Sequence, residues 1–283
     1  MTKTATLKLG LIGDNIARSR SPLLHRLAGQ QNGVEVTYDR LVPKDMAIGF
    51  DEIFDGCARQ GYHGINVTYP YKELGAKKVE VDDPLVRAVG AVNTVLFGGL
   101  RPKGFNTDYS GFMSAYRHVM GDAATGTVLM IGTGGVGRAV AFGLAGLGTR
   151  RLHLVDRDPA KAEALAEALK SVAPDMEISI WVGAEKAAEG CSGVINCTPV
   201  GMVGYEGTPL AAGALQGAVW AFDAVYTPVN TRFLQDAGAA GLKVISGWEL
   251  YFYQGVHAWS LFSGLGLDEA ALRASLIKMG DAE

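Results

Sequence analysis

The sequence has few of the residues that bind metals or form disulfide bonds. Its 283 residues include five histidines and three cysteines, Cys57, Cys191 and Cys197. The cysteines form no C-x-x-C pair, and the histidines lack the H-E-x-x-H spacing or a similar one. These spacings are typical of zinc and redox sites. We therefore expect free buried thiols and no metal site.

An excess of positive charge and an uninterrupted apolar run are also missing. Lys and Arg number 26 against 29 Asp and Glu, a net charge of −3, whereas nucleic-acid-binding surfaces are usually basic. Residues 127–149 are long enough to span a bilayer, but Arg138 and seven glycines interrupt them. A central Arg costs about 2.5–3.5 kcal/mol on insertion scales. With no signal-peptide pattern at the N-terminus, we expect a cytoplasmic protein without nucleic-acid or membrane partners.

Glycine, by contrast, is abundant: 38 residues, about 13% of the chain, against a usual value of about 7%. From Gly126 on, six apolar runs alternate with helical or loop segments, which predicts a doubly wound parallel sheet. Shorter strands and helices alternate before it, with a hairpin after residues 91–97. We expect an α/β protein with a first domain of residues 1–110, completed by 248–283, and a Rossmann domain of residues 111–247. The aromatic C-terminal helix is expected to pack back on the first domain.

A glycine-rich turn follows the first apolar run of the second domain. It satisfies G-x-G-x-x-G between a strand and a helix, and its members are Gly132, Gly134, Gly135, Val136 and Gly137. In a dinucleotide-binding turn the first glycine permits the tight turn, the second lets the backbone approach a pyrophosphate, and the third lets helix and strand pack closely. A merely structural glycine turn is the alternative.

The second strand of this domain leads into Asp156, Arg157 and Asp158. An acid at the position of Asp156 can bind a ribose 2′-hydroxyl. At about 6 Å and an effective dielectric near 20, it would repel a 2′-phosphate by roughly 3 kcal/mol per unit charge. Asp158 has a simpler role as the cap before Pro159, and Arg157 could pair with a 2′-phosphate. The pattern favours NAD and leaves NADP open.

Polar residues gather at element ends in the first domain. Lys72 stands at an expected helix start, Asn93 and Thr94 at the expected end of a strand, and Asn106, Thr107 and Asp108 after the next one. Polar residues at strand ends of α/β layers tend to share one site. A lysine and a carboxylate there could exchange a proton with a substrate hydroxyl. A solvated surface lysine is the alternative.

Three further polar residues are candidates for substrate contacts. Ser19 and Ser21 precede an apolar helical segment, where their hydroxyls could bind a carboxylate; helix capping is the alternative for Ser21 and solvent exposure for Ser19. Gln254 lies within an apolar and aromatic helix, where its amide must find partners. It could bind the substrate or only its neighbours.

Taken together, these motifs resemble those of the shikimate dehydrogenase family. The matching segments run in order along nearly the whole chain: SRSPLLH, GINVTYPYK, GAVNT, FNTD, GTGGVGRAV, NCTPVGM, FDAVYTP and YQGVHAW. The resemblance implies a substrate domain, a Rossmann cofactor domain and reversible NAD(P)-linked oxidation of shikimate to 3-dehydroshikimate. The expected partner is a small molecule of the shikimate or quinate class. The protein is expected to be a monomer or a homodimer.

The resemblance also implies a role for each matched position. Lys72 and Asp108 would be the catalytic dyad, and Ser19 and Ser21 would hold the substrate carboxylate. The ring hydroxyls would be held by Thr68, Asn93 and Gln254. Tyr226 and Gly247 would lie near the nicotinamide, and Thr198 near the cofactor.

Two departures bear on the branch of the family. Asp156, Arg157 and Asp158 stand where NADP-dependent members read N-R-T, and Tyr109 replaces a usual glycine; both resemble the NAD-using quinate/shikimate branch. Ser21, where quinate-using relatives often carry threonine, puts quinate turnover in doubt. The alternatives are an NADP-dependent biosynthetic enzyme and a non-catalytic module that senses dinucleotides.

Overall fold

The structure, a computed structural model, describes residues 6–280. Residues 1–5 and 281–283, which the expected domain boundaries include, lie outside the described residues. The chain forms two compact units. Unit 1 contains the chain up to Thr107 and again from Gln254, and unit 2 is the continuous segment Asp108–Tyr253.

Unit 1 is built on a five-stranded mixed sheet. Its strands are β1 (Thr6–Ile12), β2 (Glu35–Leu41), β3 (Gly64–Val67), β4 (Thr94–Leu96) and β5 (Lys103–Phe105), in the order β2-β1-β3-β4-β5. β1 pairs in parallel with β2 and β3. β3, β4 and β5 pair antiparallel, and the expected hairpin is the β4–β5 connection. The parallel half follows the alternation of strands and helices, whereas the short β4–β5 connection permits only an antiparallel pair.

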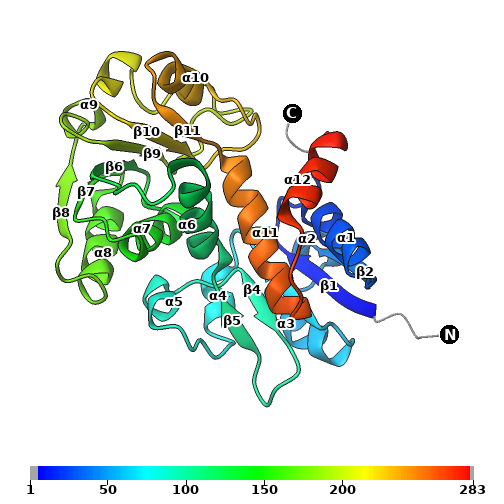
Figure 1. Ribbon diagram of the computed structural model, residues 1–283. Coiled ribbons are helices and arrows are strands. Elements are labelled where there is room, and N and C mark those ends of the chain that lie inside the picture. The colour runs from blue at the N-terminus through cyan, green and yellow to red at the C-terminus, as the bar shows by residue number, and fades with distance from the viewer. Residues whose placement is uncertain (1–5, 281–283) are drawn as a thin grey trace. The chain divides into compact units, whose positions relative to one another are not determined.

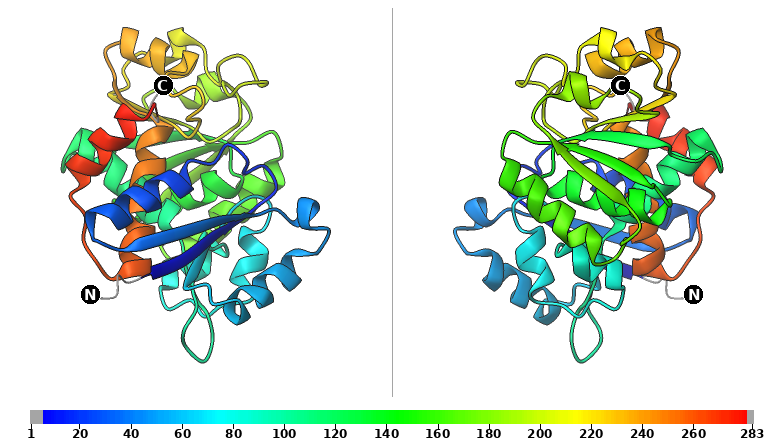
Figure 2. Two further views of the ribbon diagram at one scale, coloured as in Figure 1. Left: turned by 90° about the vertical axis from the view of Figure 1, so that its right-hand side faces the viewer. Right: turned by 90° about the vertical axis from the view of Figure 1, so that its left-hand side faces the viewer.

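Unit 1 contains helices from both ends of the sequence. They are α1 (Ser21–Gln31), α2 (Pro43–Met46), α3 (Phe50–Arg59), α4 (Lys72–Ala76), α5 (Pro84–Val89) and α12 (Glu269–Lys278). The long helix α11 (Gly247–Ser263) begins in unit 2, and its second half belongs to unit 1. There Ala258 and Phe262 pack on Leu9 and Leu11 of β1. The expected packing of this C-terminal helix on the first domain is confirmed, and α1 runs beside β2 (Figures 1 and 2).

Unit 2 contains the doubly wound sheet that the six apolar runs predict. Its strands are β6 (Thr127–Ile131), β7 (Arg151–Val155), β8 (Glu177–Trp181), β9 (Gly193–Asn196), β10 (Trp220–Asp223) and β11 (Lys243–Ile245). All neighbours pair in parallel, in the order β11-β10-β9-β6-β7-β8. This is the strand order of a dinucleotide-binding Rossmann sheet. The order reverses between β6 and β9, so the loops after these two strands flank the point where such sheets bind ligands.

Helices lie on both faces of the second sheet (Figure 1). They are α6 (Thr107–Met120), α7 (Gly135–Gly146), α8 (Pro159–Lys170), α9 (Ala184–Ala187), η1 (Ala212–Leu215) and α10 (Arg232–Ala239). Leu129 and Ala221 point to the face that α9, η1 and α10 cover. Side chains alternate along a strand, so Trp220 and Phe222 point to the other face, where they meet aromatic residues of α6.

Among residues 6–280, no helix is both long and apolar enough to cross a membrane. Within the same range, no group of three or more His, Cys, Asp or Glu side chains is arranged to hold a metal ion.

Candidate active site

Three chain segments bring polar residues to one edge of the sheet in unit 1. Thr68 directly follows β3, Asn93 directly precedes β4, and Thr107 lies two residues after the end of β5. The expectation that Asn93 and Thr94 end a strand is wrong, because β4 begins at Thr94. They still reach the expected edge because β4 runs antiparallel to β3 and Thr94 pairs with Asn66 at its end.

The side chain of Asn93 ties these segments together. Its Oδ1 accepts hydrogen bonds from the backbone N of Thr107 at 2.7 Å and from Thr107 Oγ1 at 3.2 Å, and its Nδ2 lies 2.9 Å from Thr107 Oγ1. The backbone of Asn93 accepts from Val67 N and donates to Phe105 O. Asn93 and Thr107 are 4% and 2% exposed. The edge is therefore a fixed, buried set of donors and acceptors.

A second layer of buried polar residues supports this edge. Asn66 Nδ2 donates to Thr94 Oγ1 at 3.0 Å and to the carbonyl of Asn93 at 3.1 Å. Its Oδ1 accepts from the hydroxyl of Tyr38 at 2.8 Å. Burial raises the pKa of Tyr38, against hydrogen bonding from Ser21. Tyr38 thus keeps its proton and links the edge to the start of α1.

The two candidate serines lie at the N-terminal end of α1. Ser19 Oγ is 3.3 Å from Ser21 Oγ and accepts weakly from Ser21 N at 3.4 Å. The option that Ser21 caps the helix is wrong: Arg20 is the N-cap residue, and Ser21 is already the first helical residue. The Ser21 hydroxyl is not used as a cap, which suits a role in binding.

Lys72 is the first residue of α4, as expected, and is half-buried. Its carbonyl accepts from Val92 N at 3.1 Å, one residue before Asn93. Thr68 N donates to Ile12 O, and Thr68 O accepts from Tyr71 N. These backbone bonds connect the residues around Lys72 and Thr68 to β1 and to the Asn93 segment. Lys72 is thus less exposed than a fully solvated lysine, and its role in proton transfer stays a prediction.

The other candidates for substrate contact are distributed over both units of the chain. Asp108 is the second residue of α6 and is 8% exposed, and it opens unit 2 directly after Thr107. Gln254 is half-buried on α11 and opens the second part of unit 1. Tyr226, 40% exposed in unit 2, stacks on Tyr251 with ring centroids 5.8 Å apart. The pairing of Asp108 with Lys72 stays a prediction.

The glycine turn of unit 2 has the shape expected of a dinucleotide-binding turn. Gly132 has φ +94°, which favours glycine, and a Cβ there would lie 2.8 Å from the backbone of Cys197. A Cβ on Gly137 would overlap the carbonyl oxygen of Gly132. At Gly134 and Gly135 a Cβ would meet nothing within 4 Å. The turn is therefore closed toward the sheet and open at the N-terminus of α7, where backbone N–H groups can bind phosphate.

Asp156, directly after β7, is bonded to this turn. Its Oδ2 accepts from the backbone N and the hydroxyl of Thr133 at 2.7 and 2.8 Å, and its Oδ1 accepts from Asp158 N at 2.9 Å. Partial burial alone would raise the pKa of Asp156, but these hydrogen bonds lower it below its usual value. A negative charge is thus held beside the turn. Asp158 caps α8 as expected, accepting from Ala160 N, and Arg157 is exposed.

The remaining cofactor candidates, Thr198 and Gly247, follow β9 and β11. Thr198 N and Oγ1 donate to Asn196 Oδ1 at 3.0 and 2.7 Å. Gly247 begins α11, and a Cβ there would lie 2.6 Å from the carbonyl oxygens of Ala224 and Val225. Close backbone packing is thus sufficient reason for glycine at this position, and contact with a nicotinamide stays a prediction.

Several residues that shape the site were not identified from the sequence. Tyr38, Asn66, Thr133 and Asp223 act through partners far away in the chain, such as Tyr38 with Asn66. No local spacing signals such pairs. Asn66 and Asp223 do lie within the motifs GINVT and FDAVYTP, where a polar residue inside an apolar strand indicates a buried hydrogen-bonding role.

The comparisons with known proteins agree with this architecture. Residues 11–95 match the family model described as the shikimate dehydrogenase substrate binding domain. A quinate/shikimate dehydrogenase (NAD(+)) of Corynebacterium efficiens is 35% identical over 280 residues, which cover 97% of this chain and 99% of the relative.

Two solved structures are similar over almost the whole chain. The quinate dehydrogenase from Corynebacterium glutamicum in complex with NAD has a TM-score of 0.92 at 30% identity, covering 97% of this chain and 100% of that one. The shikimate 5-dehydrogenase from Thermus thermophilus in complex with NADP(H) and shikimate has a TM-score of 0.84 at 34% identity, covering 96% and 99%. With this fold, these motifs and this extent of similarity, the chain belongs to the shikimate dehydrogenase family.

Proposed function

We propose that this protein is an oxidoreductase that reversibly oxidises shikimate to 3-dehydroshikimate with NAD as the preferred cofactor. The observation that carries the proposal is the buried edge of unit 1, where Asn93 is fixed by Thr107 beside the segments of Thr68 and Lys72. Such an edge presents fixed donors and acceptors to a small polyhydroxylated molecule. The relatives named above are dehydrogenases of shikimate and quinate.

Unit 2 has the residues that would hold the cofactor. The open side of the turn at Gly134 and Gly135 fits a pyrophosphate at the N-terminus of α7. The anchored carboxylate of Asp156 fits the hydroxyls of the adenosine ribose. Val136 completes the turn, and Thr198 and Gly247 line the side of the sheet where the nicotinamide is expected. When bound, NAD supplies the acceptor of the hydride.

The chain itself binds and orients the substrate and moves the proton. Ser19 and Ser21 hold the carboxylate at the start of α1, and Thr68, Asn93 and Gln254 hold the ring hydroxyls. Lys72, as the neutral amine, accepts the proton of the hydroxyl that becomes the ketone, and Asp108 positions Lys72. In the reverse direction Lys72, as the ammonium, returns that proton. Tyr226 is assigned to substrate binding at the nicotinamide end.

The preference for NAD rests on charge. Asp156 is held ionised by three hydrogen bonds, so a 2′-phosphate at its position would meet a fixed negative charge. At about 6 Å the repulsion is roughly 3 kcal/mol per unit charge. The two hydrogen bonds from Thr133 hold the Asp156 side chain in this orientation. A quinate/shikimate dehydrogenase that uses NAD is among the relatives.

The proposal extends to a second substrate and to the division of roles between the two domains. Quinate is a second candidate substrate, because a quinate dehydrogenase is among the solved structures, with Ser21 as the reason to expect slower turnover. We assign substrate binding to residues 1–110 with 248–283 and cofactor binding to residues 111–247. A cytoplasmic location and a monomeric or dimeric state stay predictions.

Initial-rate kinetics with shikimate and quinate, each with NAD and NADP, test the proposal. We expect shikimate with NAD to give the highest kcat/KM. A higher kcat/KM with NADP would instead support the biosynthetic alternative. Binding of NAD without oxidation of either substrate would support the non-catalytic sensing module and overturn the proposal.

A further inference from the structure

Asp223, the last residue of β10, is a fully buried carboxylate in unit 2. Three groups donate hydrogen bonds to it. Asn196 Nδ2 and Val225 N donate to its Oδ1 at 2.9 and 3.0 Å, and Thr231 Oγ1 donates to its Oδ2 at 2.6 Å. Burial of an unpaired carboxylate is costly, so this arrangement calls for a reason beyond packing.

Through Asn196, Asp223 sets the loop after β9. With its Nδ2 directed to Asp223 and to Val200 O, Asn196 turns its Oδ1 toward the N and the hydroxyl of Thr198. An amide makes such contacts only in one orientation, because its oxygen accepts and its nitrogen donates. The charge of Asp223 thus selects the orientation of Asn196 that holds Thr198.

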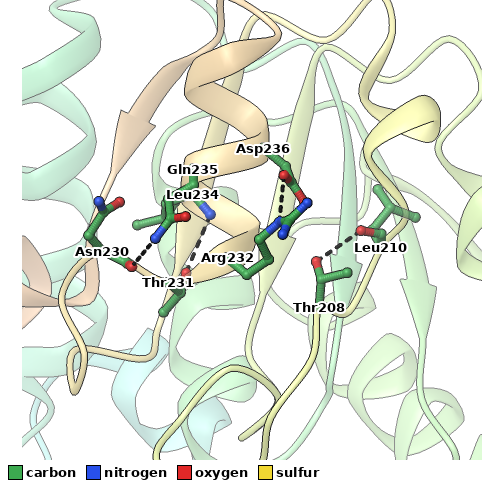
Figure 3. Close-up of polar contacts among 8 residues, drawn as sticks. All are labelled: Thr208, Leu210, Asn230, Thr231, Arg232, Leu234, Gln235 and Asp236. Atoms are coloured by element: carbon green, nitrogen blue, oxygen red, sulfur yellow. Dashed lines mark hydrogen bonds and ion pairs between the residues drawn. The ribbon is translucent and has the colours of Figure 1, made fainter.

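Through Thr231, Asp223 sets the start of α10. Thr231 is the N-cap residue of α10, and its Oγ1 accepts from Leu234 N at 3.3 Å, as the dashed line in Figure 3 shows. The same hydroxyl donates its proton to Asp223. The loop between Asp223 and α10 is therefore held at both ends, and this loop carries Tyr226.

Through Val225, Asp223 also sets the backbone beside Gly247. Its bond to Val225 N fixes the two residues after the strand, Ala224 and Val225. Their carbonyl oxygens are the atoms that a Cβ on Gly247 would meet at 2.6 Å. The start of α11 therefore packs directly against a turn that Asp223 holds.

We infer that Asp223 is a positioning residue for the nicotinamide end of the cofactor site. It joins Thr198, Tyr226 and Gly247, which come from three separate segments, through one buried carboxylate. The inference rests on the proposed function, because these three positions serve the cofactor only if the protein binds NAD. Asp223 itself touches neither substrate nor cofactor in this role.

The ionised form is the one that the surroundings require, since all three neighbours donate. Burial raises the pKa of Asp223 to about 6, although the bonds from Thr231, Val225 and Asn196 lower it. Its titratable neighbour Cys197 stays a neutral thiol, because burial and the Asp223 charge raise the pKa of that thiol. Protonation of Asp223 in mildly acidic solution therefore removes an acceptor from this arrangement.

The test measures NAD affinity by calorimetry in the absence of substrate, together with KM for NAD and for shikimate. Asp223→Asn removes the charge and leaves one acceptor oxygen for three donors. Thr231→Val removes the hydroxyl that donates to Asp223, and Thr231→Ser retains that hydroxyl. We expect the first two to raise the NAD dissociation constant about tenfold or more, with KM for shikimate changed less than about threefold. Thr231→Ser should restore wild-type affinity.

A matched control lies on the same helix. Arg232 and Asp236 form an ion pair at 2.8 Å (Figure 3), and the Arg232 side chain is 69% exposed. Exposed pairs of this kind contribute little to stability, so Arg232→Ala should leave NAD affinity unchanged. Thermal unfolding of each variant verifies that it is folded, and Thr231→Val serves if Asp223→Asn does not fold.

The pH dependence gives a readout that a purely structural role would not move. Wild-type NAD affinity should fall as the pH drops through about 6, and the affinity of Asp223→Asn should not show this inflection. Unchanged NAD affinity in folded Asp223→Asn and Thr231→Val would overturn the inference, as would an equal rise of both KM values. Failure of the proposed function is distinct: wild-type protein would bind NAD but oxidise no shikimate.

Discussion

Three pairs of atoms join Asn93 and Thr107. Asn93 Oδ1 accepts from Thr107 N at 2.7 Å and from Thr107 Oγ1 at 3.2 Å, and Asn93 Nδ2 lies 2.9 Å from Thr107 Oγ1. One amide therefore fixes the start of α6 and presents itself at the proposed substrate site. Replacement of this side chain should affect both stability and binding.

We expect Asn93→Ala to lower the free energy of unfolding by about 1–3 kcal/mol, because it leaves the buried Thr107 N–H without an acceptor. KM for shikimate should rise as well. Urea denaturation and initial rates measure the two effects. Asn32→Ala, which removes a single part-buried bond to Ala28 O, is the control and should cost less. Equal costs for the two variants would contradict this account of Asn93.

Lys72→Met should lower kcat by about 10²–10⁴-fold, the usual contribution of a general acid or base. The protein should remain folded, because Lys72 is only half-buried at the first position of α4. Lys77→Met, at the exposed C-terminal end of the same helix, should keep wild-type kcat. A kcat for folded Lys72→Met within a few-fold of wild type would show that the proton goes elsewhere.

Asp156→Ala should shift the cofactor preference toward NADP. Removing a repulsion of roughly 3 kcal/mol changes the ratio of kcat/KM for NAD to that for NADP by about 100-fold. Asp158→Asn is the comparison, since it removes a charge from an exposed residue and retains a side chain able to cap α8. Its effect should be smaller because solvent and salt screen an exposed charge. A larger shift with Asp158→Asn would show that Asp158, and not Asp156, discriminates between NAD and NADP.

His25 predicts a contribution to acid sensitivity. It stacks on Tyr38 with ring centroids 5.2 Å apart. Burial lowers the pKa of His25 to about 3, although hydrogen bonding to Asn66 raises it. In the unfolded chain a histidine has a pKa near 6.5. Between about pH 6.5 and 3 the unfolded state thus binds the extra proton, and stability falls by about 1.4 kcal/mol per pH unit as the pH drops.

His25→Phe should remove this part of the pH dependence. The difference in unfolding free energy between wild type and variant, measured by urea denaturation from about pH 7 to about pH 4.5, should change with that slope below about pH 6.5 and stay constant above it. If the unfolding free energies of wild type and His25→Phe changed with pH in parallel, His25 would take up its proton equally in the folded and unfolded states, which contradicts this account.

The parts of the fold that local pattern determines were predictable from the sequence. All six strands of unit 2 coincide with apolar runs, because a strand of a covered parallel sheet is apolar on both faces. The glycine turn was predictable for a similar reason, since Gly132 and Gly137 are required by contacts within a few residues or with the next strand.

The residues of a strand, in contrast, do not show whether it pairs in parallel or antiparallel with its neighbour. Asn93 and Thr94 were assigned to the end of a strand, whereas β4 begins at Thr94. Only the antiparallel pairing with β3 brings the start of β4 beside the end of β3. Ser21 was a candidate cap by residue type, but it is the first residue of α1, and Arg20 is the N-cap residue. The roles of Asn66 and Asp223 depend on partners brought near by the tertiary structure, such as Thr231 and Tyr38.

The assembly of unit 1 from two distant stretches of chain has a consequence for synthesis on the ribosome. Unit 2 is continuous in sequence, so it can fold once residue 253 has emerged. Unit 1 lacks part of its core until Ala258 and Phe262 reach β1, and α12 then adds the bond between Arg20 Nη2 and Met279 O. The nascent first hundred residues therefore expose the apolar face of β1 throughout the synthesis of unit 2, which makes them a substrate for chaperones.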